Sequence, residues 1–149
     1  LGNDQGRDLY KKKLVRLTER YRLTNQIKFI DHCKDMALAY KVSDIIVSAS
    51  IEPEAFGRVA VESQSMGKPI IASNIGGSKE TVLNRKSGFL YKHDDPRELA
   101  KNLNTVIQLN QEELKLMGNE GRKNVAKKFD VELMCDSNLR EYKKLLNIK

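Results

Sequence analysis

The sequence holds few of the features that mark specialised protein classes. Its 149 residues include two cysteines, three prolines, nine glycines and no tryptophan. Two cysteines cannot build a disulfide scaffold, so a reducing compartment, the cytoplasm, is the expected location. No apolar run reaches the roughly 18 residues of a membrane span, and no secretory signal opens the chain. The composition also excludes collagen-like and disordered proteins. Because the first residue is leucine, we expect a piece of a longer protein.

What the sequence does have is an excess of positive charge, formally +7. Residues 1–28 carry eight lysines and arginines against three acids, so the excess lies mainly at the amino end. Such a patch fits a solvated helix face, a nucleic-acid groove, an anionic ligand or an acidic membrane surface. The solvated face is favoured over nucleic acid, because these residues fall within a helical pattern with few aromatics among them.

Apolar periodicity predicts strands that alternate with helices over the first two-thirds of the chain. One face of the first helix carries Tyr10, Leu14, Leu17 and Tyr21. We expect strands at 27–30, 45–47, 69–72 and 88–91, and further helices at 35–41, 57–66 and 76–82. The apolar, β-branched run 45–47 is typical of a strand covered on both faces. This alternation predicts a parallel sheet.

The remaining residues, 95–149, are expected to form a helical extension. Asp95, Pro96 and Glu98 combine a cap, a proline at the first helical position and a capping-box glutamate. A second helix covers 111–128, and Asp130 begins a third, whose expected inward residues are Leu133, Met134, Tyr142, Leu145 and Leu146. The predicted fold is therefore α/β, a Rossmann-like parallel sheet with extra carboxyl-terminal helices. Ligands bind such sheets at the carboxyl ends of the strands.

The loop 48–58 leads from a predicted strand into the amino end of a helix. Unpaired N–H groups and a partial positive charge make such an end a site for phosphate, and Gly57 permits close approach. Glu54 precedes this helix, and Glu62 lies within it, where a carboxylate is expensive unless it binds something. The element thus offers groups for a diphosphate and for vicinal hydroxyls. The alternative is that Glu54 only interacts with the helix dipole and Glu62 is solvated.

These residues resemble a family motif. Glu54 and Glu62, with Phe56 and Gly57 between them, are similar to the E-x7-E motif of retaining glycosyltransferases of the GT-B fold, family GT4. The similarity continues in the family's order through the segments 65–73, 76–80 and 87–90. Residues 1–149 resemble the family's carboxyl-terminal, nucleotide-sugar-binding domain, truncated at its amino end.

The resemblance implies a role for each site residue. Glu54 matches the catalytic glutamate, which contacts hydroxyls of the donor sugar and steadies positive charge at the anomeric carbon. Glu62 matches the glutamate that takes the two ribose hydroxyls. The main-chain N–H groups of Arg58 and Val59 would meet the distal phosphate. The other donor-binding residues that it implies are His32 and Cys33 beside the base, Phe56, Gly57, Gly76 and Gly77.

The implied activity is sugar transfer with retention from a UDP-, GDP- or ADP-linked donor, without cofactor or metal. The resemblance places it in the synthesis of a cell-envelope polysaccharide, lipopolysaccharide or glycolipid, in the cytoplasm or at the inner face of the membrane. A missing amino-terminal domain would bind the acceptor, so this chain alone should bind donor without turnover. The strand at 27–30 would expose a sheet edge open to self-association. The alternative function is a non-catalytic nucleotide- or nucleic-acid-binding module, motivated by the charge of +7.

Overall fold

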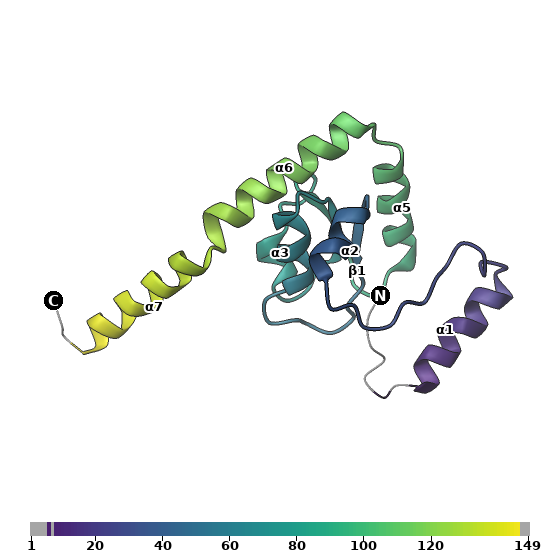
Figure 1. The fold of residues 1–149 in the computed structure, drawn as a ribbon, viewed down its shortest axis with the longest axis horizontal. Helices are drawn as coiled ribbons and strands as arrows, with labels where there is room; N and C mark the ends of the chain where they lie inside the picture. Colours follow the sequence, from purple (N-terminus) through teal and green to yellow (C-terminus); the bar gives the residue numbers. More distant parts are fainter. Residues whose placement is uncertain (1–5, 7, 147–149) are drawn as a thin grey trace. The chain divides into compact units, whose positions relative to one another are not determined.

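The computed structural model describes residue 6 and residues 8–146 of the chain. The chain forms two compact units, residues 1–39 and residues 40–149. Figure 1 traces it from helix α1 (Asp8–Arg20) in the first unit to helix α7 (Val131–Leu145) in the second. Helix α2 (Met36–Val42) begins in the first unit and ends in the second.

In the first unit, the predicted first helix is confirmed as α1, but fewer of its residues are buried than the apolar spacing predicts. Thr18 is buried, and its hydroxyl donates to the carbonyl oxygen of Leu14 at 2.9 Å. Tyr10 and Tyr21 were expected on the same side, but they are 59% and 64% exposed. A tyrosine tolerates this position because its hydroxyl stays hydrated while its ring covers part of the surface.

The strand predicted at 27–30 is wrong. This segment has no regular secondary structure, and Ile27, Phe29 and Ile30 are all exposed. A strand is stabilised by hydrogen bonds to a neighbouring strand, and no strand in the described residues pairs with this segment. Its β-branched and aromatic residues supply strand propensity but no partner.

The second unit contains a parallel sheet, as predicted. Its three strands lie in the order β1-β2-β3, and their bounds are Ile46–Ser48, Ile70–Ser73 and Gly88–Tyr91. The middle strand, β2, is buried along its whole length. The prediction that β1 is covered on both faces is wrong, because Val47 is 40% exposed. Helix α5 (Pro96–Ile107) packs on β2 and β3, and β1 is an edge strand of the described sheet.

Alternate side chains of β2 enter two separate cores, one on each face of the sheet. Ile70 and Ala72 pack with residues of α3 (Arg58–Ser65), while Ile71 packs with Val106 of α5. This alternation follows from the period of two of a strand. Helices therefore cover both faces of the sheet, as in a Rossmann-like fold.

Three helices of the second unit begin directly after a residue whose side chain caps them. Asp95 accepts hydrogen bonds from the N–H groups of Arg97 and Glu98 at the start of α5, both at 3.0 Å. Asn110 caps α6 (Gln111–Lys128), and Asp130 caps α7. The short helix α4 (Ser78–Thr81) follows β2. The starts of α5, α6 and α7 agree with the predicted ones because capping is a local interaction.

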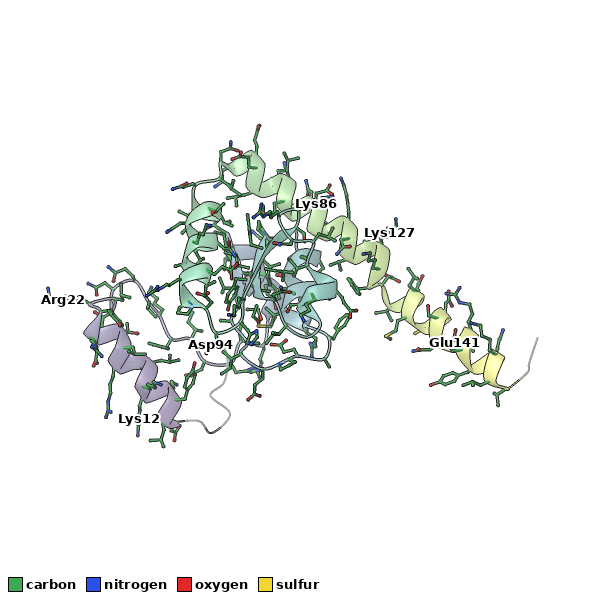
Figure 2. The ribbon with its side chains drawn as sticks, turned by 180° about the vertical axis from the view of Figure 1, so that it is seen from behind. Lys12, Arg22, Lys86, Asp94, Lys127 and Glu141 are labelled. Carbon is green, nitrogen blue, oxygen red and sulfur yellow. The ribbon has the colours of Figure 1, made fainter. Side chains whose placement is uncertain are left out.

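The prediction that the apolar residues of α7 face inward is wrong. No residue of this helix is buried, and the exposed fractions of Leu133, Met134, Tyr142, Leu145 and Leu146 range from 44% to 78%. Figure 2 shows side chains standing out along α7, with Glu141 labelled among them. Apolar spacing identifies a helix face, but it does not supply the element that would cover this face.

Candidate functional site

The loops that follow β1 and β2 pack main chain against main chain. Parallel strands end at the same edge of their sheet, which brings residues 49–57 and residues 74–77 together. The N–H of Gly77 donates to the carbonyl oxygen of Glu54 at 2.8 Å. A Cβ at Gly76 would collide with the main chain of Glu54, and one at Gly77 with the main chain of Phe56. Glycine at both positions therefore lets the two loops touch.

Helix α3 begins at this junction, directly after Gly57. Gly57 has a φ of 75°, and its carbonyl oxygen accepts from the N–H groups of Ala60 and Val61 at 3.0 and 3.3 Å. No side chain among the described residues caps the helix. The N–H groups of Arg58 and Val59 in the first turn are of the kind that lack an intrahelical acceptor. This end of α3 therefore suits an anionic group.

One and a half turns into α3, the carboxylate of Glu62 has a partner on each oxygen. Its Oε2 accepts from the hydroxyl of Tyr40 at 2.9 Å. Its Oε1 accepts from Nη2 and Nε of Arg58 at 2.9 and 3.2 Å. The Arg58 side chain is 83% exposed and that of Glu62 is 35% exposed. Glu62 is thus half-buried and partnered, which differs from the solvated carboxylate of the alternative interpretation.

Tyr40 is the buried member of this group, with 4% of its surface exposed. Its burial and its hydrogen bond to Glu62 together raise the pKa of Tyr40 from 10.0 to about 12. Burial disfavours the phenolate, and a negative carboxylate nearby disfavours it further. The hydroxyl consequently keeps its proton near neutral pH and acts as a donor to Glu62.

The other carboxylate, that of Glu54, lies in the loop between β1 and α3. Its Oε1 accepts a hydrogen bond from the hydroxyl of Ser50. Phe56, two residues further on, leaves nearly half of its surface exposed. The ring of Phe56 meets that of Phe129 edge-on, with the centroids 5.7 Å apart, which joins the loop to the end of α6.

The structure brings together most of the residues that the sequence singled out. Glu54 and Phe56 meet Gly76 and Gly77, and Gly57, Arg58, Val59 and Glu62 form the cap and the first turns of α3. His32 and Cys33 belong to the first unit. There, His32 is exposed, and the Cys33 Sγ donates to the carbonyl oxygen of Asp35 at 3.2 Å.

Sequence reasoning missed two polar partners, Tyr40 and Ser50. Tyr40 lies in the helix predicted at 35–41, where it is buried, but no role in the site was predicted for it. A signal for its second role exists, because the hydroxyl of a buried tyrosine needs a hydrogen-bond partner and Glu62 needs a donor. Ser50 precedes Glu54 by four residues, in a loop whose path the sequence does not determine.

Two wider features of the described residues bear on what the site can hold. Histidine, cysteine and acidic side chains form no group of three or more there that could bind a metal ion. None of the helices described combines the length and apolar character needed to span a bilayer. The described groups of the site are main-chain N–H groups, two carboxylates and Arg58, which supply hydrogen bonds and charge.

Comparison with known proteins identifies similar sequences. The family model described as "Glycosyl transferases group 1" matches residues 5–124. A capsular polysaccharide biosynthesis glycosyltransferase, CapM of Staphylococcus aureus, is 30% identical over 111 residues, which is 74% of this chain and 28% of CapM. A D-inositol 3-phosphate glycosyltransferase of Streptomyces bingchenggensis is 32% identical over 109 residues, 71% of this chain and 24% of that protein. The chain thus spans about a quarter of the length of these curated relatives.

Solved structures give the same result for the fold. A glycosyltransferase from Rickettsia africae superposes with a TM-score of 0.93 and 34% identity, covering 99% of this chain and 39% of that one. HepE from Anabaena, solved in complex with UDP and glucose, gives a TM-score of 0.89 and 28% identity, covering 96% and 39% of the two chains.

Proposed function

This chain belongs to the group 1 glycosyl transferase family, and we propose that it holds the nucleotide-sugar donor during transfer of the sugar to an acceptor. Its fold is that of a GT-B glycosyltransferase domain. The UDP complex of the Anabaena relative supports a nucleoside diphosphate as the leaving group. Because the chain spans only part of its relatives, the proposal concerns donor binding, and acceptor binding is assigned to another region of the enzyme.

The observation that carries the proposal is the amino end of α3, uncapped by any described side chain, between two half-buried carboxylates. The N–H groups of Arg58 and Val59 bind the distal phosphate in our proposal, because a helix amino end stabilises negative charge. Glu62 binds the ribose hydroxyls, and Glu54 binds hydroxyls of the transferred sugar. Phe56, Gly57, Gly76 and Gly77 shape the loops around the donor.

For the chemical step we propose retention of configuration. The bond between the anomeric carbon and the diphosphate oxygen breaks, and the diphosphate takes the electron pair. The acceptor oxygen then bonds to the anomeric carbon on the same face and loses its proton to the departing diphosphate. The helix end stabilises the growing negative charge, and the Glu54 carboxylate stabilises the positive charge left on the sugar.

The product in our proposal is a cell-envelope polysaccharide, a lipopolysaccharide or a glycolipid, and the similarity to CapM, a capsular polysaccharide biosynthesis glycosyltransferase, supports the first of these. We place the protein in the cytoplasm, at the inner face of the membrane. The free cysteines, Cys33 and Cys135, fit that reducing compartment. The exposed basic residues Lys12, Lys13 and Arg16 of α1 support a peripheral contact with an anionic membrane.

The proposal is tested by calorimetry of the chain with UDP, GDP and ADP. We expect one nucleotide to bind more tightly than the others, and Glu62→Ala to lose that binding. The matched control is Glu120→Ala, because Glu120 also forms an ion pair on a helix surface, with Lys123 at 2.9 Å. It should bind nucleotide like the unchanged chain.

The alternative, a nucleic-acid-binding module, predicts a different result. Oligonucleotides would then bind tightly, with an affinity that falls steeply with salt, and no mononucleotide would be preferred. That outcome, or nucleotide binding that Glu62→Ala leaves unchanged, would contradict the proposed function.

A further inference from the structure

The two partners of Glu62 differ sharply in their surroundings. Tyr40 is 4% exposed, whereas the side chain of Arg58 is 83% exposed. Both hold the carboxylate at 2.9 Å, Tyr40 on Oε2 and Arg58 on Oε1. An exposed ion pair between residues four apart on a helix is weak and easily exchanged for water or ligand. A hydrogen bond from a buried hydroxyl to a carboxylate is stronger and fixed in direction.

We propose that the Tyr40 hydroxyl holds Glu62 in the orientation that reads the ribose of the donor, so that Tyr40 sets the preference for a ribonucleotide over a deoxyribonucleotide. The inference rests on the proposed function, in which Glu62 takes the ribose hydroxyls. Tyr40 acts here as a positioning residue, because it works through Glu62.

Recognition of a diol by a carboxylate depends on the direction of the carboxylate plane. Two neighbouring hydroxyls can donate to separate oxygens of one carboxylate when both oxygens face them. A glutamate side chain has several rotatable bonds, so an untethered Glu62 adopts many directions. Tyr40 removes this freedom from the buried side, and Arg58 leaves Oε1 when the ribose arrives.

Without the Tyr40 hydroxyl, the described contacts of the Glu62 carboxylate reduce to Arg58 alone. The exposed guanidinium then draws the carboxylate toward solvent, away from a fixed direction. The raised pKa of Tyr40 supports the assignment, because the phenol keeps its proton and remains a donor. Removing this hydroxyl should therefore weaken the binding of ligands with both ribose hydroxyls much more than the binding of ligands with one.

The experiment compares the preferred nucleoside diphosphate with its deoxyribose counterpart by calorimetry, in the full chain. We expect the unchanged chain to bind the ribonucleotide about tenfold more tightly, the effect of one hydrogen bond to a charged group. Tyr40→Phe should bring that ratio near one and leave the affinity for the deoxyribonucleotide within about twofold. Tyr91→Phe is the matched control: Tyr91 is also 4% exposed, but burial alone raises its pKa.

The possible outcomes separate this inference from the proposed function. If Tyr40→Phe lowers both affinities equally, the role of Tyr40 is structural and the inference is wrong. The inference is also wrong if Tyr40→Phe leaves the ratio of ribonucleotide to deoxyribonucleotide affinity unchanged. If Glu62→Gln leaves the ratio unchanged, or no nucleotide binds, the proposed function fails. If Glu62→Gln removes the ratio and Tyr40→Phe does not, the function stands without the inference.

A second measurement uses the unchanged sequence and does not depend on whether a variant folds. In a chain labelled with fluorotyrosine, the fluorine NMR signal of Tyr40 should move more with the ribonucleotide than with the deoxyribonucleotide. Equal movement with both ligands would overturn the inference.

Discussion

The carbonyl oxygen of Glu54 accepts a hydrogen bond from the N–H of Gly77 at 2.8 Å, so a single residue joins two loops of the candidate site. Its side chain is held separately by Ser50. The position of the Glu54 carboxylate therefore depends on the contact between the loops, and that contact depends on glycine at 76 and 77. Local changes in the loop after β2 should reach the donor site through this connection.

Gly76→Ala should displace the loop that carries Glu54. A methyl group at this position would collide with the Glu54 main chain, and Gly76 also has a positive φ of 52°. We expect a loss of at least about 2 kcal/mol in the free energy of unfolding, together with loss of nucleotide binding.

Gly67→Ala is the control for this prediction. Gly67 has a φ of 68°, but an added Cβ would meet nothing within 4 Å. It should cost about 1 kcal/mol, the effect of the left-handed conformation alone, and should keep nucleotide binding. Urea unfolding and calorimetry measure both effects, and equal losses in the two variants would argue against the loop contact.

Glu54→Gln should separate recognition of the sugar from recognition of the nucleotide. The carboxylate is proposed to bind hydroxyls of the sugar, while the helix end and Glu62 bind the remainder of the donor. Calorimetry should therefore show a weaker affinity for the sugar-linked nucleotide, by about tenfold, with the free nucleotide unaffected. An equal loss of affinity for both ligands would show that Glu54 stabilises the loop and does not bind the sugar.

Tyr40 should give the fold a pH dependence in the alkaline range. The pKa of Tyr40 is about 12 in the folded chain, whereas a tyrosine in an unfolded chain has a pKa of 10.0. Folding therefore favours the protonated phenol. This stabilisation is complete below about pH 10 and is lost as the pH rises through about 12. The free energy of unfolding of the unchanged chain should thus fall more steeply over this range than that of Tyr40→Phe. Urea unfolding at stepped pH measures the difference, and parallel curves would contradict it.

Asn124→Ala should destabilise the packing of α6 on its neighbours. The Asn124 amide donates to the carbonyl oxygen of Thr81 at 3.1 Å, and the Gln64 amide donates to the same oxygen at 3.0 Å. Loss of a buried hydrogen bond should lower the free energy of unfolding by about 1–2 kcal/mol. Asn119→Ala, on the exposed side of α6, should change it by less than about 0.5 kcal/mol. Similar values for the two variants would show that the shared carbonyl contributes little.

Local signals predicted much of the fold. The caps at Asp95 and Asp130 mark helix starts, and apolar runs mark the strands at β2 and β3, because these features depend on neighbouring residues. The strand at 27–30 and the inward-facing side of α7 were predicted wrongly for one common reason. Their apolar residues need a covering element, and residue spacing does not show whether that element is present.

The candidate site was predicted less completely. The sequence placed Glu54, Gly57 and Glu62 on the loop and helix where they lie, because the order of strand, loop and helix determines this. It did not predict the hydroxyl of Tyr40, which is 22 residues from Glu62 in the sequence. A hydrogen bond between two helices depends on how the helices pack, and residue spacing does not predict it.

Phosphate binding at the amino end of α3 is tested most directly by a titration of the chain with UDP, GDP and ADP, followed by amide NMR. We expect the amide signals of Arg58 and Val59 to move most with the preferred nucleotide, since their N–H groups meet its phosphate. Movement confined to the basic residues of α1, or no movement at Arg58 and Val59 at saturating nucleotide, would show that the donor does not bind there.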